Sequence, residues 1–329
     1  MKKTILILST ATLATICFQS CSKSTSIGKN DANKNFFDSW IQIYHPEAKE
    51  ENGIFILDEK QGTGEVLRDV EKDPYVTLSF TVCDLDGNIV ETTRAEVAQQ
   101  LGTYSESGFY GPTLTVRRQN VMKAGLEKIL EGMRAGGTKK AVVPGWFDTK
   151  KWYESDKEYF EKESGTDYIY DVKLEEIISD LKTYQIDSIE NYLSHNFSFK
   201  VDSTMFGYYY IQTKAPSDTA SFGKEATVKV NYTGRLLNGL VFDTTDKDTA
   251  KDAYLYTAGK DYAPYEVELQ EDYTDMETVQ GFSYCISKMK KGEKGICIFY
   301  SGLGYGGSGQ SSIPAYSPLR FDIEMLGTK

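Results

Sequence analysis

The sequence predicts an α+β fold of two similar domains, each an antiparallel curved sheet wrapped on one short helix, joined by a helical connector. The first observation is an internal repeat, because residues 80–93 match residues 232–245, 152 positions later, without a gap. The second is that each copy reads as a strand, an Asp-Gly or Asn-Gly turn and another strand, a strong hairpin signal. The third is the alternation of apolar and polar residues in segments such as 228–232, which suits strands half buried against a helix.

The N-terminus has the pattern of a secretory signal. Lys2 and Lys3 precede an almost uncharged, mostly apolar run that ends at Phe18 and is too short to cross a membrane. Cys21 follows this run. The segment 18–21 resembles a bacterial lipobox, although Phe18 stands where Leu is commoner.

The lipobox resemblance implies that residues 1–20 are a cleaved signal peptide and that Cys21 carries lipid. Residues 21–34 would then be a polar tether. Several acyl chains would anchor the protein stably, because each buried CH₂ contributes about 0.8 kcal/mol. We therefore expect a lipid-anchored protein of the bacterial cell envelope, on the outer membrane and facing the periplasm or the cell surface. The alternative is an ordinary cleaved signal peptide with a chance cysteine.

Composition narrows the function classes. The formal net charge is −11 and no basic cluster occurs, so we expect no nucleic-acid partner. Once the signal is cleaved and Cys21 is lipidated, Cys83, Cys285 and Cys297 remain. This odd number without a C-x-x-C motif argues against a disulfide framework or a zinc site. We expect buried small hydrophobes, while a Cys285–Cys297 bridge stays open. The two histidines, His45 and His195, are too few for a His-based metal site, and we expect neither a metal nor a cofactor.

A second block of the chain also repeats. Residues 125–136 match residues 281–292, and each reads as a short helix followed by a glycine-containing turn and then a strand. The closing strands correspond as well, at residues 170–172 and 321–323. Both halves therefore predict the same order of elements.

The segments that lead into each half read as helices. Apolar residues recur at helical spacing in residues 35–45 and again in residues 174–195, where Leu174, Ile177, Ile178 and Leu181 would form one stripe. The second segment lacks a Gly/Ser or Pro run, so we expect a packed helix between the domains. The resulting division of the mature chain is a first domain at 35–180, a helical connector at 181–204 and a second domain at 205–329.

The second half resembles the FKBP-type peptidyl-prolyl isomerase family at several separated points. Val230 to Gly234 is similar to its V-x-Y-T-G strand, and Asn238 to Thr245 to its D-G-x-x-F-D-S-S hairpin. Val279 to Phe282 resembles the opening of its helix. The remaining matches lie in the turn after that helix and in the closing segments, at residues 289–294, 303–306, 313–314 and 319–324. Because the matches keep their order over about 100 residues, the whole chain resembles a tandem FKBP lipoprotein.

This resemblance implies a folding catalyst whose second domain isomerises prolyl bonds without a covalent intermediate. Such bonds turn slowly, because amide resonance sets a barrier of about 18–20 kcal/mol. An apolar, aromatic-lined pocket can bury the proline ring, remove water from the carbonyl and so favour the twisted amide. The expected partners are proline-containing polypeptides.

The resemblance also implies the site residues. The catalytic set is Tyr232, Phe242, Asp243, Phe282 and Tyr305, and the substrate-binding set is Tyr265, Val279, Ile313 and Phe321. Phe282 would form the floor, Tyr305 would donate to a substrate carbonyl, and Asp243 would supply the polar edge. Asp243 has the alternative role of capping a turn, and aromatic residues in strands are usually packing residues. The sequence departs from the family in having Phe282 where Trp is commoner, and Gln310 and Ser312 where many members carry His and Ile.

The first half lacks most of this set. The replacements are Phe80 for Tyr232, Val90 for Phe242, Glu91 for Asp243 and Leu126 for Phe282. A charged, aromatic segment at 148–168 stands where the second half has Tyr-Gly, and it is either a client-binding flap or a solvated loop. We expect the first domain to be a degenerate, FKBP-like binding or spacer module. Two further functions stay open for the whole chain, a chaperone that binds clients without turnover and an envelope scaffold.

Overall fold

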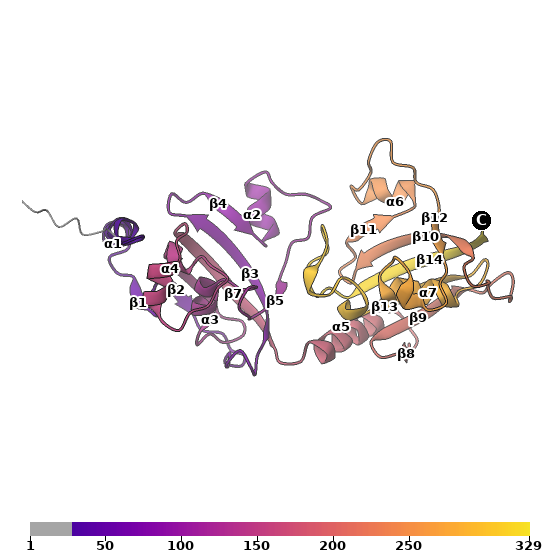
Figure 1. The fold of residues 1–329 in the computed structure, drawn as a ribbon, viewed down its shortest axis with the longest axis horizontal. Coiled ribbons are helices and arrows are strands. Elements are labelled where there is room, and N and C mark those ends of the chain that lie inside the picture. The colour runs from indigo at the N-terminus through magenta and orange to yellow at the C-terminus, as the bar shows by residue number, and fades with distance from the viewer. Residues whose placement is uncertain (1–27) are drawn as a thin grey trace, which may run out of the picture.

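The computed structural model describes residues 28–329, which form two lobes side by side (Figure 1). The first lobe comprises residues 28–178 and the second residues 181–329. The predicted signal peptide, the expected lipidation site Cys21 and the first part of the expected tether lie outside the described residues. Within residues 28–329 we find no helix that combines the length and the apolar character needed to cross a bilayer.

The first lobe is built on a seven-stranded antiparallel sheet. Its strands run in the order β1-β2-β6-β7-β3-β4, and β5 pairs with β3. The strands are β1 (Lys49–Glu51), β2 (Ile54–Lys60), β3 (Tyr75–Asp84), β4 (Ile89–Thr92), β5 (Thr113–Val116), β6 (Thr138–Val143) and β7 (Tyr168–Ile178). The helices are α1 (Asp31–Tyr44), α2 (Ala95–Gln100), α3 (Ala124–Leu130), the 3₁₀ turn η1 (Gly145–Phe147) and α4 (Asp156–Lys162).

The second lobe repeats this topology strand for strand. The order is β8-β9-β13-β14-β10-β11, and β12 pairs with β10. The strands are β8 (Ser203–Met205), β9 (Tyr208–Lys214), β10 (Thr227–Leu236), β11 (Val241–Thr244), β12 (Tyr265–Glu268), β13 (Lys294–Phe299) and β14 (Leu319–Thr328). The helices are α5 (Leu181–Asn196), α6 (Lys247–Asp252) and α7 (Gln280–Lys288), with 3₁₀ turns η2 (Tyr273–Asp275), η3 (Ser301–Leu303) and η4 (Gly306–Ser308). The predicted α+β fold of two antiparallel sheets is therefore confirmed.

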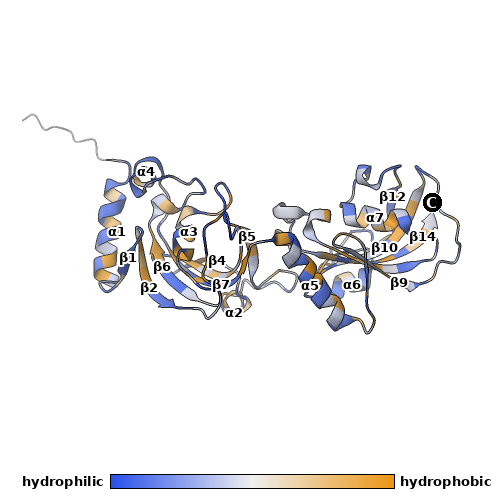
Figure 2. Cartoon of the chain, turned by 90° about the horizontal axis from the view of Figure 1, so that it is seen from below, coloured by the Kyte–Doolittle hydropathy of each residue, from blue (hydrophilic) through white to orange (hydrophobic). Residues whose placement is uncertain are grey.

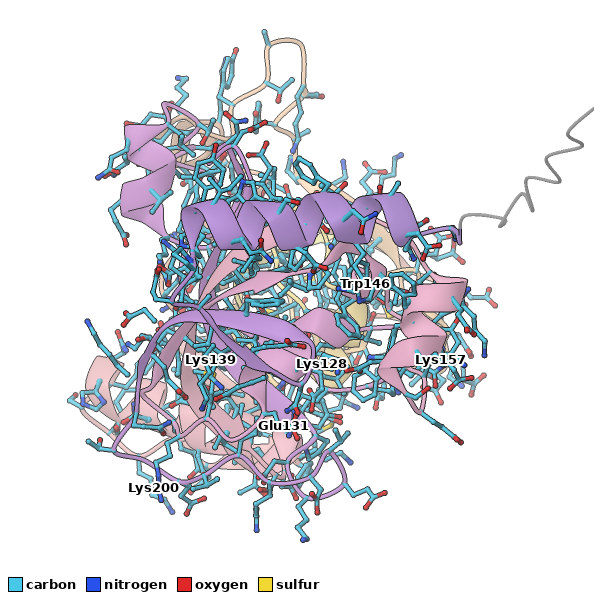
Figure 3. The ribbon with its side chains drawn as sticks, turned by 90° about the vertical axis from the view of Figure 1, so that its left-hand side faces the viewer. Lys128, Glu131, Lys139, Trp146, Lys157 and Lys200 are labelled. Atoms are coloured by element: carbon cyan, nitrogen blue, oxygen red, sulfur yellow. The ribbon has the colours of Figure 1, made fainter. Side chains whose placement is uncertain are left out.

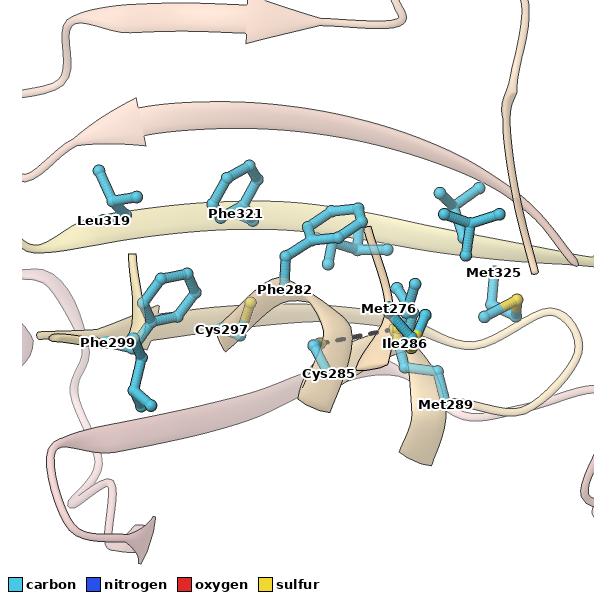
Figure 4. Packing of buried hydrophobic residues seen from close by; sticks show 14 of the residues in the cluster. Met276, Phe282, Cys285, Ile286, Met289, Cys297, Phe299, Leu319, Phe321 and Met325 are labelled. Atoms are coloured by element: carbon cyan, nitrogen blue, oxygen red, sulfur yellow. Dashed lines mark hydrogen bonds between the residues drawn. The ribbon is translucent and has the colours of Figure 1, made fainter. Parts of the chain in front are cut away.

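One short helix fills the inner face of each sheet. Along β14 buried residues alternate with more exposed ones, as expected for a strand with one face in the core. Phe321 and Ile323 belong to the same buried cluster as Phe282 and Ile286 of α7. Figure 4 shows the rings of Phe282 and Phe321 near each other, one from the helix and one from the strand. Coloured by hydropathy, the strands carry orange apolar residues beneath the helices, while blue residues gather on outer surfaces and loops (Figure 2).

A longer helix covers the outer face of each sheet. Phe37 and Ile41 of α1 pack with Val142 in the first lobe, where α1 lies across the sheet (Figure 3). Ile189 and Leu193 of α5 pack in the same way on β9 and β13. The connector helix is thus part of the packing of the second lobe.

The predicted helix over 174–195 begins too early. Residues up to Ile178 belong to β7, which is hydrogen-bonded to β3 on one side and to β6 on the other. Leu174 and Ile178 are buried in the first lobe. Asp180 then caps α5, since its side chain accepts a hydrogen bond from the backbone N–H of Thr183 at 3.0 Å.

Ser179 and Asp180 join the lobes, and the side chain of each makes a hydrogen bond within one of them. Ser179 Oγ donates to Asp73 Oδ1 in the first lobe at 2.9 Å, while Asp180 is the N-cap of α5 in the second. The lobes also touch through Tyr75 and Tyr316, whose ring centroids are 5.5 Å apart in an edge-to-face arrangement.

The interpretation of residues 148–168 as a solvated loop is wrong. This segment contains α4, and Tyr159 on that helix is buried against Phe147 with ring centroids 5.0 Å apart. Trp152 Nε1 donates to the carbonyl oxygen of Met122 at 2.9 Å. The aromatic residues therefore complete the core of the first lobe.

The three cysteines within residues 28–329 are free. Cys285 and Cys297 are buried in the second core, as the sequence predicts, whereas Cys83 is half-buried. Burial raises the pKa of the Cys297 thiol well above its usual value. These two thiols act as small apolar residues between helix and sheet (Figure 4).

Candidate functional site

A cavity of about 360 Å³ opens in the second lobe between the sheet, the start of α7 and the loop after β13. It is lined by Tyr232, Phe242, Asp243, Tyr265, Glu277, Thr278, Val279, Phe282, Tyr305, Gln310 and Phe321. Every site residue predicted from the sequence lines this cavity except Ile313. The residues come from β10, β11, β12, β14 and α7 and from the loops before α7 and after β13, so the fold brings distant parts of the chain together.

Phe282 lies at the inner end of the cavity. Its side chain is 3% exposed, and its ring meets Tyr232 and Phe321 edge-to-face, with centroid distances of 5.4 and 5.0 Å. Phe242 meets Phe321 in the same manner at 5.5 Å. The aromatic edges fix the floor and one wall of an apolar chamber.

Gly234 makes room for this wall. A Cβ atom on Gly234 of β10 would overlap the ring of Phe242 and crowd that of Phe321. The absence of a side chain at this position lets Phe242 lie against the strand. The two rings can therefore meet only because residue 234 is glycine.

The polar edge of the cavity is a tyrosine–carboxylate pair. Tyr232 Oη donates to Asp243 Oδ2 at 2.5 Å. The other carboxylate oxygen accepts from the backbone N–H of Thr244 at 2.9 Å and lies 3.4 Å from Lys260 Nζ. Asp243 therefore lines the cavity with its carboxylate held by Tyr232 and by the backbone of Thr244.

The tyrosine hydroxyls of the site stay protonated. Burial raises the pKa of Tyr232 far above its ordinary value, and the hydrogen bond to Asp243 raises it further. Burial also raises the pKa of Tyr305, with a smaller contribution from the negative charge of Asp243. Both hydroxyls are thus hydrogen-bond donors and not acids at neutral pH.

Ile313 supports the site from behind. It is buried in the core and exchanges two backbone hydrogen bonds with Gln310, at 2.9 and 2.7 Å. The prediction that Ile313 contacts substrate is not met by this geometry, since the turn presents Gln310 and not Ile313 to the cavity. The resemblance of Ile313 to the family motif identified the turn. It could not show which residue of the turn faces the cavity.

Sequence reasoning missed Glu277 and Thr278 at the rim. Both directly precede Val279, the first residue of the matched helix motif, and this adjacency is the signal that could have found them. Burial is the main cause that raises the pKa of Tyr265, and the negative charge of Glu277 raises it further. Among residues 28–329 no cluster of His, Cys, Asp and Glu could hold a metal ion.

A larger cavity, of about 490 Å³, lies in the first lobe beneath α1. Aromatic residues on α1, η1 and α4 line it, including Phe37, Trp146 and Phe160; Figure 3 shows Trp146 under α1 and Lys157 on α4. It lies on the outer side of the first sheet, so it is not the counterpart of the cavity in the second lobe.

Residues 219–326 match the family model described as FKBP-type peptidyl-prolyl cis-trans isomerase. The FKBP-type peptidyl-prolyl cis-trans isomerase FkpA of Buchnera aphidicola is 33% identical over 129 residues, which are 39% of this chain and 44% of the relative. A probable FKBP-type isomerase of Haemophilus influenzae is 34% identical over 128 residues, 38% of this chain and 44% of its own.

FK506-binding protein 1A of Aspergillus fumigatus is 27% identical over 119 residues, 35% of this chain and 90% of its own length. The chain spans less than half the length of the first two relatives. The residues that match the family model lie in the lobe that holds the aromatic cavity. Through this second lobe, the chain is similar to the FKBP-type peptidyl-prolyl cis-trans isomerases.

Proposed function

We propose that the second lobe catalyses the cis–trans isomerisation of prolyl bonds in polypeptides. The observation that carries this proposal is the cavity itself, an apolar chamber floored by Phe282 with the Tyr232–Asp243 pair at its edge. Its volume of about 360 Å³ suits a proline ring and the residue before it. The family match to residues 219–326 supports the same chemistry.

The proposed catalysis is non-covalent. Rotation about the prolyl bond breaks amide resonance, so the twisted state has a less polar carbonyl than the planar state. The proline ring packs on Phe282 and the edge of Phe321, which removes water from the bond and disfavours the planar form. Tyr305, protonated at neutral pH, donates to a substrate carbonyl and holds the peptide in place.

Asp243 has a positioning part in this scheme. Its Oδ2 is fixed by Tyr232 and its Oδ1 by the backbone of Thr244, so the carboxylate cannot swing into the chamber. The fixed negative edge interacts with the changing dipole of the amide during rotation. Because the carboxylate of Asp243 is already oriented, it does not have to move while the prolyl bond rotates.

The matched pair Asp243→Ala and Glu91→Ala tests the proposal in the full chain. The two residues occupy the same place in the repeated hairpins. With a tetrapeptide that contains one prolyl bond, Asp243→Ala should lower kcat/KM at least tenfold, or about 1.4 kcal/mol of transition-state stabilisation. Glu91→Ala should leave kcat/KM unchanged. Full activity in an Asp243→Ala/Tyr305→Phe variant would place the reaction elsewhere, and an inactive wild type that suppresses aggregation would make the chain a chaperone.

We also propose that the chain works in the bacterial cell envelope, anchored by lipid on Cys21. The support is the apolar run that ends at Phe18 and the cysteine that follows it. Cys21→Ser should move the protein from the membrane fraction to the soluble fraction after cell fractionation. A Cys21→Ser protein that still sediments with membranes after a high-salt wash would contradict the anchor, with Cys83→Ser as the control that should stay in the membrane fraction.

A further inference from the structure

The repeat between the lobes extends beyond the hairpin into a projecting segment. Strand pairing aligns residues 75–116 with residues 227–268 at a constant offset of 152. Between the hairpin and the next strand each lobe has a short helix and a loop, which we call the arm, at residues 94–112 and 246–264. Figure 1 shows α2 and α6 on the same edge of their lobes.

Each of the two arms contains a pair of stacked tyrosines. Tyr256 and Tyr262 stack with ring centroids 5.7 Å apart, and Tyr104 and Tyr110 stack at 4.9 Å. In each case the hydroxyl of the second tyrosine accepts a hydrogen bond from the backbone N–H after the first, at 2.9 Å in the second lobe and 3.1 Å in the first. The arm is therefore a shaped element and not a loose connection.

The arms differ at the residue that follows the helix by two positions. Tyr254 stands in the second lobe where the first has Gly102, and both have a positive φ, of 57° and 68°. This backbone region is unfavourable for a tyrosine and free of strain for glycine. Tyr254 is 68% exposed, so little packing offsets the strain. A strained, exposed aromatic residue indicates a function outside the fold.

A second difference joins the arm to the cavity. Lys260 stands where the first lobe has Gly108, and its Nζ lies 3.4 Å from Asp243 Oδ1 and 5.3 Å from the ring centroid of Tyr262. Tyr265, at the end of the arm, lines the cavity and is 38% exposed. Lys260 and Tyr265 thus connect the arm to the edge of the cavity.

We propose that the arm of the second lobe, through Tyr254 and Tyr256 and together with the adjoining Tyr265 of β12, docks an extended segment of the unfolded client that flanks the proline held in the cavity. The inference rests on the proposed isomerase function and extends it from the prolyl bond to the polypeptide around it. Tyrosines suit clients of varied sequence, because the ring contacts apolar side chains and the hydroxyl bonds backbone groups at a small cost in side-chain entropy. The first-lobe arm, with Gly102 and Gly108, lacks this surface.

The test compares two substrates of the full chain. A tetrapeptide with one prolyl bond fills the cavity alone, whereas reduced and carboxymethylated ribonuclease T1, whose folding is limited by prolyl isomerisation, also reaches the arm. Tyr254→Gly and Tyr254→Gly/Tyr256→Ala should lower kcat/KM for the protein about fivefold and tenfold more than for the tetrapeptide. Phe206→Ala removes an equally exposed aromatic residue at the β8–β9 turn and should leave the ratio unchanged.

The fold provides an internal check, because Tyr254→Gly removes strain and should keep or raise Tm. Tyr254→Asn, which also tolerates positive φ, serves as the second variant. If the wild type isomerises both substrates and the variants leave the ratio of the two kcat/KM values unchanged, the docking role of the arm is refuted. The proposed isomerase function would then still stand. An equal fall for both substrates would also overturn docking, since the arm would then act on the cavity through Lys260. A wild type that isomerises neither substrate would refute the proposed function itself.

Discussion

The two lobes share one topology, yet only the second has an aromatic chamber on the inner face of its hairpin. The difference is a linked set of residues. Gly234 leaves space for the ring of Phe242, whereas the first lobe has Val82 and Val90 at these places, and Val90 is 54% exposed. A side chain at 82 occupies the volume that an aromatic at 90 would need. The comparison teaches that the chamber requires several residues at once and cannot be reached by one substitution.

The polar edge differs in the same coordinated way. Tyr232 and Asp243 form a short hydrogen bond, while Phe80 has no hydroxyl to offer Glu91. By strand register, Tyr170 takes the place of Phe321, and burial raises its pKa beyond the usual range. A buried neutral tyrosine therefore stands where the second lobe has the inner wall of its cavity.

The lobes also differ in what their interiors contain. The first buries charged groups in two ion pairs, Asp73 with Arg68 and Arg117 with Glu127, while the second buries the carboxylate of Glu293 beside Tyr210. The second core is dominated by rings that meet edge-to-face around Phe282 and Phe321. Since Trp40, Trp146 and Trp152 are the three tryptophans of the chain, tryptophan fluorescence follows the first lobe alone. This optical asymmetry allows each lobe to be perturbed and observed separately.

The largest effect is expected from Phe282→Ala. It removes a buried ring and leaves an empty volume at the floor of the aromatic cavity, so it should cost about 3–5 kcal/mol of unfolding free energy in the second lobe. The matched Leu126→Ala removes a half-buried side chain at the equivalent helix position and should cost below about 2 kcal/mol. Urea unfolding should show a shifted circular-dichroism transition for Phe282→Ala with an unmoved tryptophan transition. A shift of both signals would mean that the lobes do not unfold independently.

Acid should weaken the first lobe by a predictable amount. Hydrogen bonds from Arg68 lower the pKa of Asp73 from 3.8 to about 2. Because the folded pKa is depressed, this stabilisation is complete above pH 4 and is lost as pH falls toward 2, a change of about 2 kcal/mol. The difference in unfolding free energy between wild type and Asp73→Asn, measured by tryptophan fluorescence, should shrink by this amount from pH 5.5 to pH 2. A difference that does not change with pH would show that Asp73 acts only through its shape.

The smallest effect in stability is expected from Gly234→Val, which gives β10 the residue found in the first lobe. The new side chain displaces Phe242 and should cost about 1–1.5 kcal/mol. It should nevertheless lower kcat/KM for the prolyl tetrapeptide about tenfold, because the chamber loses a wall. The reciprocal Val82→Gly should create no activity in an Asp243→Ala background. Gly234→Val with normal activity would mean that Phe242 is not part of the working site.

Local patterns in the sequence were sufficient for the hairpins and for most of the cavity. The Asn-Gly turn at 238–239 and the motif around Phe282 place their residues through short-range rules, so their positions could be predicted. The helix expected from Leu174 failed because a bulge in the β3–β7 pairing at Thr77/Leu78 breaks the alternation of the strand. Apolar residues at 174, 177 and 178 then mimic helical spacing.

The remaining misses depend on tertiary packing. Whether Ile313 or Gln310 faces the cavity is decided by the turn that the two residues close with each other. Likewise, Trp152 and Tyr159 look like loop aromatics until the core of the first lobe surrounds them. The likeness between the arms rests on few identities, among them Tyr104 with Tyr256 and Tyr110 with Tyr262, so only the common strand register makes it evident.

The joint at Ser179 and Asp180 has a mechanical consequence. Ser179 is hydrogen-bonded to the buried carboxylate of Asp73 in the first lobe, and Asp180 caps α5 of the second lobe. We therefore expect little rotation of one lobe against the other at this joint. The two lobes should then tumble in solution as one elongated particle with a single rotational correlation time. In such a particle the first lobe would be a rigid spacer, which sets the distance between the aromatic cavity of the second lobe and residue 28.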